Sequence, residues 1–173
     1  WYPVPQGPKV SAYASWQGIN AHRTGGANSW SVIAADAARG LGFLPTTSPS
    51  VDYWGGARLG DNRYANSLVA LDARSGKQVW AFQTVHHDLW DYDPTAAPKL
   101  LTVQHDGKPV DIVAEPTKRG WVAGFNRVTG EPLGSLEERP APEGDGAGEE
   151  AGPAQQVATP KQPRGGQDSQ GRG

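Results

Sequence analysis

The residues best suited to chemistry lie in one short stretch, His86-His87-Asp88-Leu89-Trp90-Asp91-Tyr92-Asp93. Three carboxylates this close together repel one another when all are ionised, so we expect at least one raised pKa unless a cation or hydrogen bonds compensate. A carboxyl group of that kind suits a general base or a metal site. The competing interpretation is a solvated loop in which two of the aspartates cap turns and the aromatic rings pack. Composition alone favours that second interpretation.

Other candidate residues carry weaker signals. His86 and His87 are adjacent, so on a strand they would point to opposite faces, and no third metal ligand stands at a recognisable spacing. Lys118, in Thr117-Lys118-Arg119-Gly120, would ordinarily lie in a basic surface turn, and Trp30 would ordinarily be a core aromatic. The sequence has no cysteine, which excludes disulfides, thiolate metal sites and cysteine nucleophiles.

Composition limits the classes of protein that remain. The 173 residues carry a formal net charge of −2, which argues against a nucleic-acid-binding protein. Hydrophobic residues make up 36%, and the 23 glycines and 15 prolines bring the chain close to low-complexity composition, but seven tryptophans argue for a folded core. The sequence contains no methionine, so we expect it to be a fragment, with any targeting segment or membrane anchor outside it.

The elements that must position these residues are short β-type runs separated by turn signals, with almost no helical periodicity apart from one candidate turn over 34–39. The sequence therefore predicts an all-β fold. We expect strands over residues 31–35, 42–45, 67–72, 78–83, 111–115 and 121–126.

Two of the predicted hairpins resemble each other. The first begins at Ala70 and has its turn at Ser75-Gly76; the second begins at Gly124 and has its turn at Thr129-Gly130. A period of about 50 residues is typical of propeller blades. We therefore predict a partial β-propeller over 31–135, preceded by an irregular N-terminal segment over 1–30 and followed by a Pro/Gly-rich loop or disordered tail over 136–173.

A series of short motifs follows one another along the chain. The motifs are Ala27-Asn28-Ser29-Trp30, Pro45-Thr46-Thr47-Ser48-Pro49, Asp52-Tyr53-Trp54-Gly55-Gly56, Arg63-Tyr64-Ala65-Asn66-Ser67, Ala70-Leu71-Asp72 through Trp80, Gln83-Thr84-Val85-His86-His87-Asp88-Leu89-Trp90-Asp91, Thr117-Lys118-Arg119-Gly120 and Thr129-Gly130-Glu131. Each motif is weak alone, whereas their order and spacing are specific. Taken together, they resemble the motifs of the pyrroloquinoline quinone (PQQ)-dependent dehydrogenases, most closely the membrane-bound glucose dehydrogenase type.

The resemblance implies about two to three blades of an eight-bladed propeller that binds PQQ and Ca²⁺, with a cofactor-side loop in the segment over 1–30. It also implies that residues 70–80 form a tryptophan-docking motif, in which Trp80 packs on a neighbouring blade. It implies that Asp91 is the catalytic base and that Lys118 hydrogen-bonds the quinone oxygens. Trp30 matches the aromatic floor under the PQQ ring, and a flat indole is suited to stack on a planar quinone. Ser48 matches a calcium-ligand position, where a neutral oxygen suits this hard cation.

The sequence departs from the family pattern at three positions. Thr47 stands where glycine is usual, Pro94 follows Asp93 without a spacer, and Gly134 replaces the tryptophan of the second docking motif. The first two departures adjoin the implied metal and base positions.

The function that the resemblance implies is oxidation of a sugar or an alcohol, with hydride passing to PQQ and electrons passing on to ubiquinone or another respiratory acceptor. The implied location is the periplasm, with any association with the inner membrane made by segments outside this chain. Two alternatives stay open: a non-catalytic propeller scaffold of the outer-membrane assembly type, and an inactive truncated fragment. The pairing of Trp90-Asp91 with Thr117-Lys118 distinguishes the enzyme from the scaffold, which has no reason to keep it.

Overall fold

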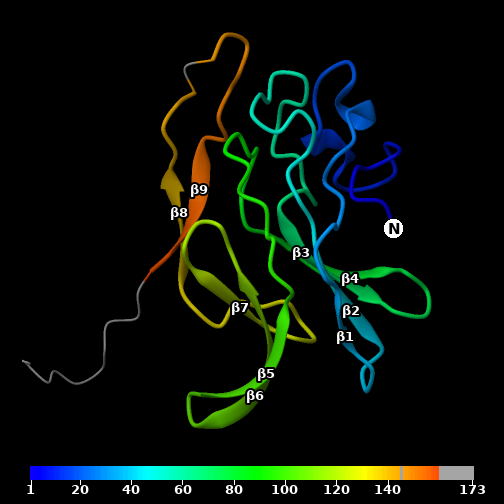
Figure 1. Cartoon of the computed structure of the whole chain (residues 1–173), viewed down its shortest axis with the longest axis vertical. Coiled ribbons are helices and arrows are strands. Elements are labelled where there is room, and N and C mark those ends of the chain that lie inside the picture. The colour runs from blue at the N-terminus through cyan, green and yellow to red at the C-terminus, as the bar shows by residue number, and fades with distance from the viewer. Residues whose placement is uncertain (145, 160–173) are drawn as a thin grey trace, which may run out of the picture.

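The first sheet is a four-stranded antiparallel meander. The structure is a computed structural model, and residues 1–144 and 146–159 of it are described. The strands lie side by side in chain order, as Figure 1 shows. They are β1 (Ala34–Asp36), β2 (Leu41–Pro45), β3 (Ser67–Asp72) and β4 (Gln78–Gln83).

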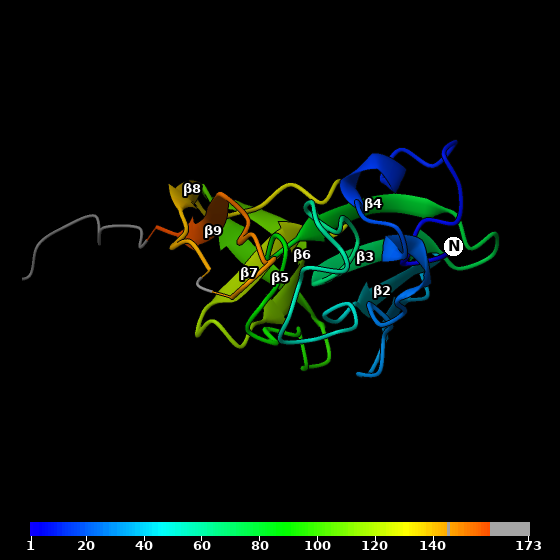
Figure 2. The same ribbon diagram turned by 90° about the horizontal axis from the view of Figure 1, so that it is seen from above.

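A second antiparallel meander follows, formed by β5 (Lys99–His105), β6 (Lys108–Pro116) and β7 (Val122–Asn126). Seen from above, the two sheets lie side by side, and the pair β8 (Leu136–Pro140) and β9 (Ala154–Ala158) lies beyond the second sheet (Figure 2). The described helical structure is confined to two 3₁₀ turns, η1 (Tyr13–Ser15) and η2 (Ala21–Arg23). None of the described helices has the length and apolar character needed to cross a membrane. The all-β prediction is confirmed.

The predicted hairpin turns form as expected. Gly76 and Gly130 have φ values of +66° and +75°, a left-handed conformation that glycine adopts at little cost. The sequence analysis missed β5, although Asp106-Gly107 between β5 and β6 is a strong hairpin signal, and both residues have positive φ. The helical turn considered over 34–39 does not form, because residues 34–36 pair with β2 instead.

The segment after residue 135 also differs from the prediction. A Pro/Gly-rich loop or disordered tail was expected over 136–173, yet β8 and β9 pair over five residues each. This pair buries little apolar surface and is joined to the rest by polar contacts: the Gln155 side chain exchanges two hydrogen bonds with the His86 backbone, at 2.9 and 2.5 Å. Such contacts leave no hydrophobic pattern in the sequence. Residues 145 and 160–173 lie outside the described residues.

An apolar core joins the two sheets. Phe43 and Leu68 from the first sheet and Val113 and Phe125 from the second are completely buried within it. Trp80 of β4 crosses the boundary: its ring lies so close to Gly130 that a Cβ there would come within 2.6 Å, and its indole N–H donates to the Arg127 carbonyl at 3.2 Å. The predicted docking of this tryptophan on the neighbouring blade is therefore present.

The second repeat lacks the equivalent contact. Gly134 stands at the position that corresponds to Trp80, and a Cβ built there would meet no atom within 4 Å. Residues 131–135, which follow the Thr129-Gly130 turn, add no fourth strand to this sheet, and Pro132 makes an isolated bridge with Phe125 instead. The absence of an indole at this position thus coincides with a shortened blade.

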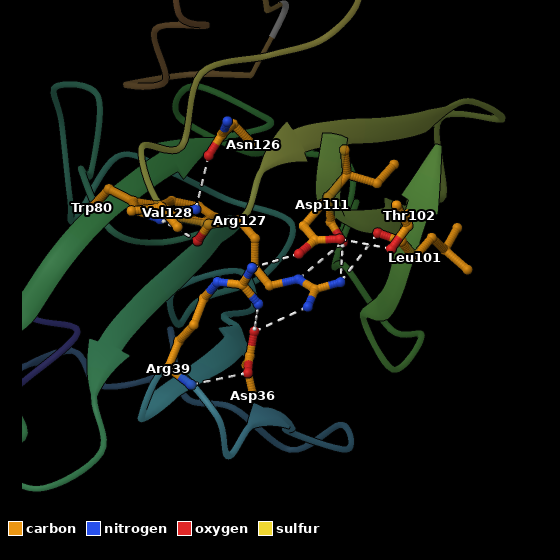
Figure 3. A network of polar contacts seen from close by, with 10 residues as sticks. Asp36, Arg39, Trp80, Leu101, Thr102, Asp111, Asn126, Arg127 and Val128 are labelled. Carbon is orange, nitrogen blue, oxygen red and sulfur yellow. Dashed lines mark hydrogen bonds and ion pairs between the residues drawn. The ribbon is translucent and has the colours of Figure 1, made fainter. Parts of the chain in front are cut away.

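A buried ionic network also links the sheets, at the edge away from the loops described below. Arg127 donates to Asp36 Oδ2 at 2.9 Å, and Arg39 donates to the same oxygen at 2.8 Å (Figure 3). The hydrogen bond from Arg127, opposed by burial and assisted by Arg39, lowers the pKa of Asp36 to about 2. Arg39 continues the network to Asp111 on β6, whose other carboxylate oxygen accepts a hydrogen bond from Thr102.

Glu115 on β6 makes the stability of the fold depend on pH. Its side chain is completely buried, neither carboxylate oxygen has a hydrogen-bond partner in the described structure, and burial raises its pKa to about 8. Because the folded pKa lies above the unfolded value, the contribution of Glu115 to stability should be most favourable below about pH 4.5 and fall as pH rises to about 8.

We expect Glu115→Gln to remove this pH dependence and to stabilise the protein at pH 7 by on the order of 3 kcal/mol. Urea unfolding at pH 5, 7 and 8.5 measures the effect. Glu143→Gln, at an exposed position, is the matched control and should leave the slope unchanged. Parallel pH profiles for the native protein and Glu115→Gln would contradict the assignment.

Candidate functional site

The topology brings the candidate residues to one edge of the sheets. In the antiparallel first sheet, β1 begins at the edge where β2 and β4 end. Trp30 precedes β1, Ser48 follows β2, and Asp91 follows β4, so the three occupy neighbouring connections, above the strands in Figure 1. Lys118 follows β6 of the second sheet and reaches the same place.

Asp91 and Lys118 form a direct ion pair. The ammonium group of Lys118 lies 3.0 Å from Asp91 Oδ2 and also donates to the Asp91 carbonyl at 2.7 Å. The Tyr53 hydroxyl donates to the same carboxylate oxygen at 3.3 Å. Asp91 has a φ of +56°, an uncommon conformation for a residue with a side chain. Lys118 thus holds both the backbone carbonyl and the side chain of Asp91.

The electrostatics follow from this pairing. Burial acts to lower the pKa of Lys118, but the hydrogen bond and negative charge of Asp91 outweigh it, so the pKa is raised. The charge of Asp91 likewise raises the pKa of Tyr53. Lys118 and Tyr53 therefore keep their protons at neutral pH, and both donate hydrogen bonds to the Asp91 carboxylate.

Asp93 connects Trp30 to Ser48. Its Oδ2 accepts a hydrogen bond from the Trp30 indole N–H at 3.1 Å, and its Oδ1 accepts one from the Ser48 backbone N–H at 2.6 Å. Trp30 is not the core residue that its type alone would suggest, since 58% of its surface is exposed. The Trp30 ring therefore faces solvent, and the hydrogen bond from its indole N–H to Asp93 holds it.

Asp88 occupies the centre of the loop. Its carboxylate accepts hydrogen bonds from the backbone N–H groups of Trp90 and Tyr92, from the Ser48 hydroxyl and from the Asn66 amide. The expected repulsion among Asp88, Asp91 and Asp93 is thus offset by donors at every carboxylate.

Sequence reasoning missed three residues that hold this site. Tyr53 contacts Asp91, Asn66 bridges Ser48 and Asp88, and Arg58 is a completely buried cation that donates to the Asp88 carbonyl at 2.7 Å and the Val51 carbonyl at 2.9 Å. Tyr53 and Asn66 lie within motifs that were already recognised. Arg58 follows the Gly55-Gly56 pair, and nothing in its spacing indicates that it is buried.

The histidines do not form a metal site with this cluster. His87 is buried, with Nδ1 2.7 Å from the Gly60 carbonyl, and His86 Nε2 lies 3.2 Å from Glu138. Across residues 1–144 and 146–159, no three His, Asp or Glu side chains are grouped so as to hold a metal ion. The Ser48 hydroxyl, the implied calcium ligand, donates to Asp88 and accepts from Asn66.

The same region instead presents an exposed aromatic ring and a partly exposed cation. Trp30 offers an exposed aromatic face, and Lys118 provides a cation whose side chain is 36% exposed. Residues 1–172 match the family model of the glucose/ethanol/alcohol dehydrogenase β-propeller domain, which is named for PQQ. The chain belongs to this PQQ-dependent dehydrogenase family.

Individual relatives agree with this membership. The chain is 40% identical over 129 residues to a quinoprotein glucose dehydrogenase of Escherichia coli, covering 74% of this chain and 16% of that protein. It is 42% identical over 125 residues to a quinate/shikimate dehydrogenase (quinone) of Acinetobacter baylyi, covering 71% of this chain and 16% of that protein. The chain therefore spans about a sixth of the length of these curated relatives.

A solved structure of the family has the same fold. The protein superimposes on a quinohemoprotein alcohol dehydrogenase of Pseudomonas putida with a TM-score of 0.69 and 31% identity. The match covers 77% of this chain and 21% of the other. The two meandering sheets are thus blades of a quinoprotein β-propeller.

Proposed function

We propose that this chain forms the part of a PQQ-dependent dehydrogenase that carries the catalytic base and one face of the cofactor site, in an enzyme that oxidises a sugar or an alcohol. The observation that carries the proposal is the Asp91–Lys118 ion pair, joined through a single loop to the exposed ring of Trp30. A propeller scaffold has no need of a partly exposed acid–cation pair beside an exposed indole.

In this proposal Asp91 takes the proton from the substrate hydroxyl. Its side chain is 28% exposed, so a substrate can reach it, and Lys118 and Tyr53 direct one carboxylate oxygen. When PQQ is bound, it supplies the acceptor for the hydride that leaves the carbon bearing the substrate hydroxyl. Proton removal by a positioned carboxylate contributes typically 10²–10⁴-fold to rate.

In this proposal Lys118 interacts with two different partners, the Asp91 carboxylate and the cofactor. In the absence of cofactor its ammonium neutralises Asp91, and its raised pKa keeps it charged across the physiological range. With the cofactor present, the same cation would hydrogen-bond the electron-rich quinone oxygens, where positive charge favours the reduced form. The lysine can move between these partners because its side chain is only partly buried.

Calcium stays a prediction for this family member. A lone hydroxyl that is already hydrogen-bonded on both sides does not make a site for an ion that takes six to eight oxygens. Ser48 could contribute at most one ligand, after exchanging its bond to Asp88, and the others would have to come from elsewhere. No step proposed here passes through the metal.

The substrate, the electron acceptor and the compartment are proposed at the level of class. Related proteins are named for glucose, glycerol and quinate or shikimate, which all carry a secondary or primary alcohol. We propose a respiratory quinone such as ubiquinone as the acceptor and the periplasm as the location, as the resemblance implies. Detection of the protein in the periplasmic fraction, and reduction of a soluble quinone on addition of substrate, would test both.

Cofactor binding tests the core of the proposal. We expect Trp30→Leu to weaken the affinity of the apoenzyme for PQQ by about tenfold, because it removes the stacking surface while leaving Asp91 and Lys118 in place. Titration with PQQ, followed by quenching of tryptophan fluorescence, gives the affinity. Tyr2→Leu, which removes an exposed aromatic ring in the N-terminal segment, is the control. Equal PQQ affinity for the native enzyme and Trp30→Leu would refute the proposal.

A further inference from the structure

We propose that Asp93 is a positioning residue: it fixes the orientation of the Trp30 indole and so presents the ring to the cofactor. The inference rests on the proposed function, because it assigns Trp30 to the cofactor site. It adds a role for a carboxylate that, within the described residues, makes no hydrogen bond to the proposed base or to Lys118.

The indole needs an anchor because little packing holds it. More than half of Trp30 is exposed, whereas Asp93 is 94% buried, with 6% of its surface accessible. The hydrogen bond of 3.1 Å between the indole N–H and Asp93 Oδ2 is the polar contact that the described structure gives this side chain. A buried charged acceptor makes such a bond stronger and more directional than a neutral one.

Asp93 is itself fixed at its other oxygen. Oδ1 accepts the Ser48 backbone N–H at 2.6 Å, and Ser48 is 4% exposed, so that N–H has no access to water if the bond is lost. The carboxylate therefore cannot rotate freely to follow the indole. The position of the Ser48 loop therefore determines, through Asp93, the position of the Trp30 ring.

A carboxylate is required because two donors converge on one side chain. An ionised Asp offers two acceptor oxygens, whereas Asn offers one oxygen and one NH₂ group. In Asp93→Asn the oxygen should keep the buried Ser48 N–H, because leaving that donor unpaired is the costlier outcome. The NH₂ group would then face the indole N–H, so two donors would oppose each other and the ring would be displaced.

The test is a double-mutant cycle on the apoenzyme with PQQ as the ligand. Asp93→Asn should weaken PQQ affinity by about tenfold, the scale of one charge-assisted hydrogen bond. Trp30→Phe keeps an aromatic face but has no N–H, so in that background Asp93→Asn should change the affinity less than twofold. An equal loss in both backgrounds would mean that Asp93 acts through general folding, and would overturn the proposal.

A measurement without cofactor separates this inference from the proposed function. In the apo chain with ¹⁵N-labelled tryptophan, the indole N–H resonance missing in Trp30→Phe identifies Trp30. Asp93→Asn should move that resonance and speed its exchange with water, and Asp93→Glu should partly restore it. An unmoved resonance would overturn the anchor. A moved resonance, together with PQQ affinity unchanged in Trp30→Leu, would leave the anchor standing and remove the cofactor role.

Discussion

Replacing Asp91 by Asn in the PQQ-loaded enzyme is expected to lower kcat by roughly 10²–10⁴-fold, the usual contribution of a general base. Asn has nearly the same shape, and its amide oxygen can still accept the hydrogen bond from Lys118, which spans 3.0 Å in the native protein. Cofactor affinity should therefore change little. Steady-state kinetics combined with PQQ titration separates the two effects.

The control for this variant is Asp106→Asn, which makes the same chemical change in the hairpin turn between β5 and β6, at the far edge of the second sheet. It should leave both kcat and PQQ affinity unaltered. If Asp91→Asn retained near-normal turnover with full cofactor loading, Asp91 would not be the base, and most of the functional proposal would have to be abandoned.

Replacing Arg127 by Met is expected to destabilise the fold by about 3–5 kcal/mol, the range measured when one partner of a buried ion pair is removed. Its guanidinium contacts Asp36 at 2.9 Å and also donates to the carbonyl groups of Leu101 and Ile112, so one side chain joins three strands (Figure 3). The substitution leaves the buried Asp36 with Arg39 as its cationic partner. The midpoint of urea unfolding at pH 7 reports the loss.

Arg39→Met provides the matched comparison, because Arg39 contacts the same oxygen of Asp36 at 2.8 Å but is 37% exposed. Its effect should be much smaller, since solvent screens exposed pairs. The loss of stability at low pH should also differ between Arg39→Met and Arg127→Met. The pKa of Asp36 is depressed to about 2, so its stabilisation is present above about pH 4 and is lost as pH falls through 2. Equal losses for the two variants would show that burial does not govern this network.

Much of the fold was predictable because it depends on local signals. The bounds of β3 and β4 and the turns at Gly76 and Gly130 agree with the prediction, since alternating β-branched or aromatic residues and a left-handed glycine act over a few positions. The pair β8–β9 was not predictable in the same way. It is held by polar contacts to a loop far away in sequence, such as Gln155 with the His86 backbone.

The site was predictable as a set of residues but not as a geometry. The resemblance supplied Trp30, Ser48, Asp91 and Lys118, and the structure brings all four to one loop region. Asp91 and Lys118 contact each other directly, whereas Trp30 and Ser48 are connected through the two carboxylate oxygens of Asp93. A sequence shows that a carboxylate is present, but not which distant donors it accepts.

The links between the two sheets also have a consequence for synthesis on the ribosome. The first sheet is complete once residue 83 has been made, yet the Trp80 indole receives its cover only with Gly130, and Asp36 meets Arg127 only 91 residues later in the chain. At about 5–20 residues per second, a nascent first blade spends several seconds with an uncovered indole and an aspartate that lacks its main cation. During that interval the growing chain exposes an apolar edge that is prone to aggregation, because the second sheet that covers it has not yet been made.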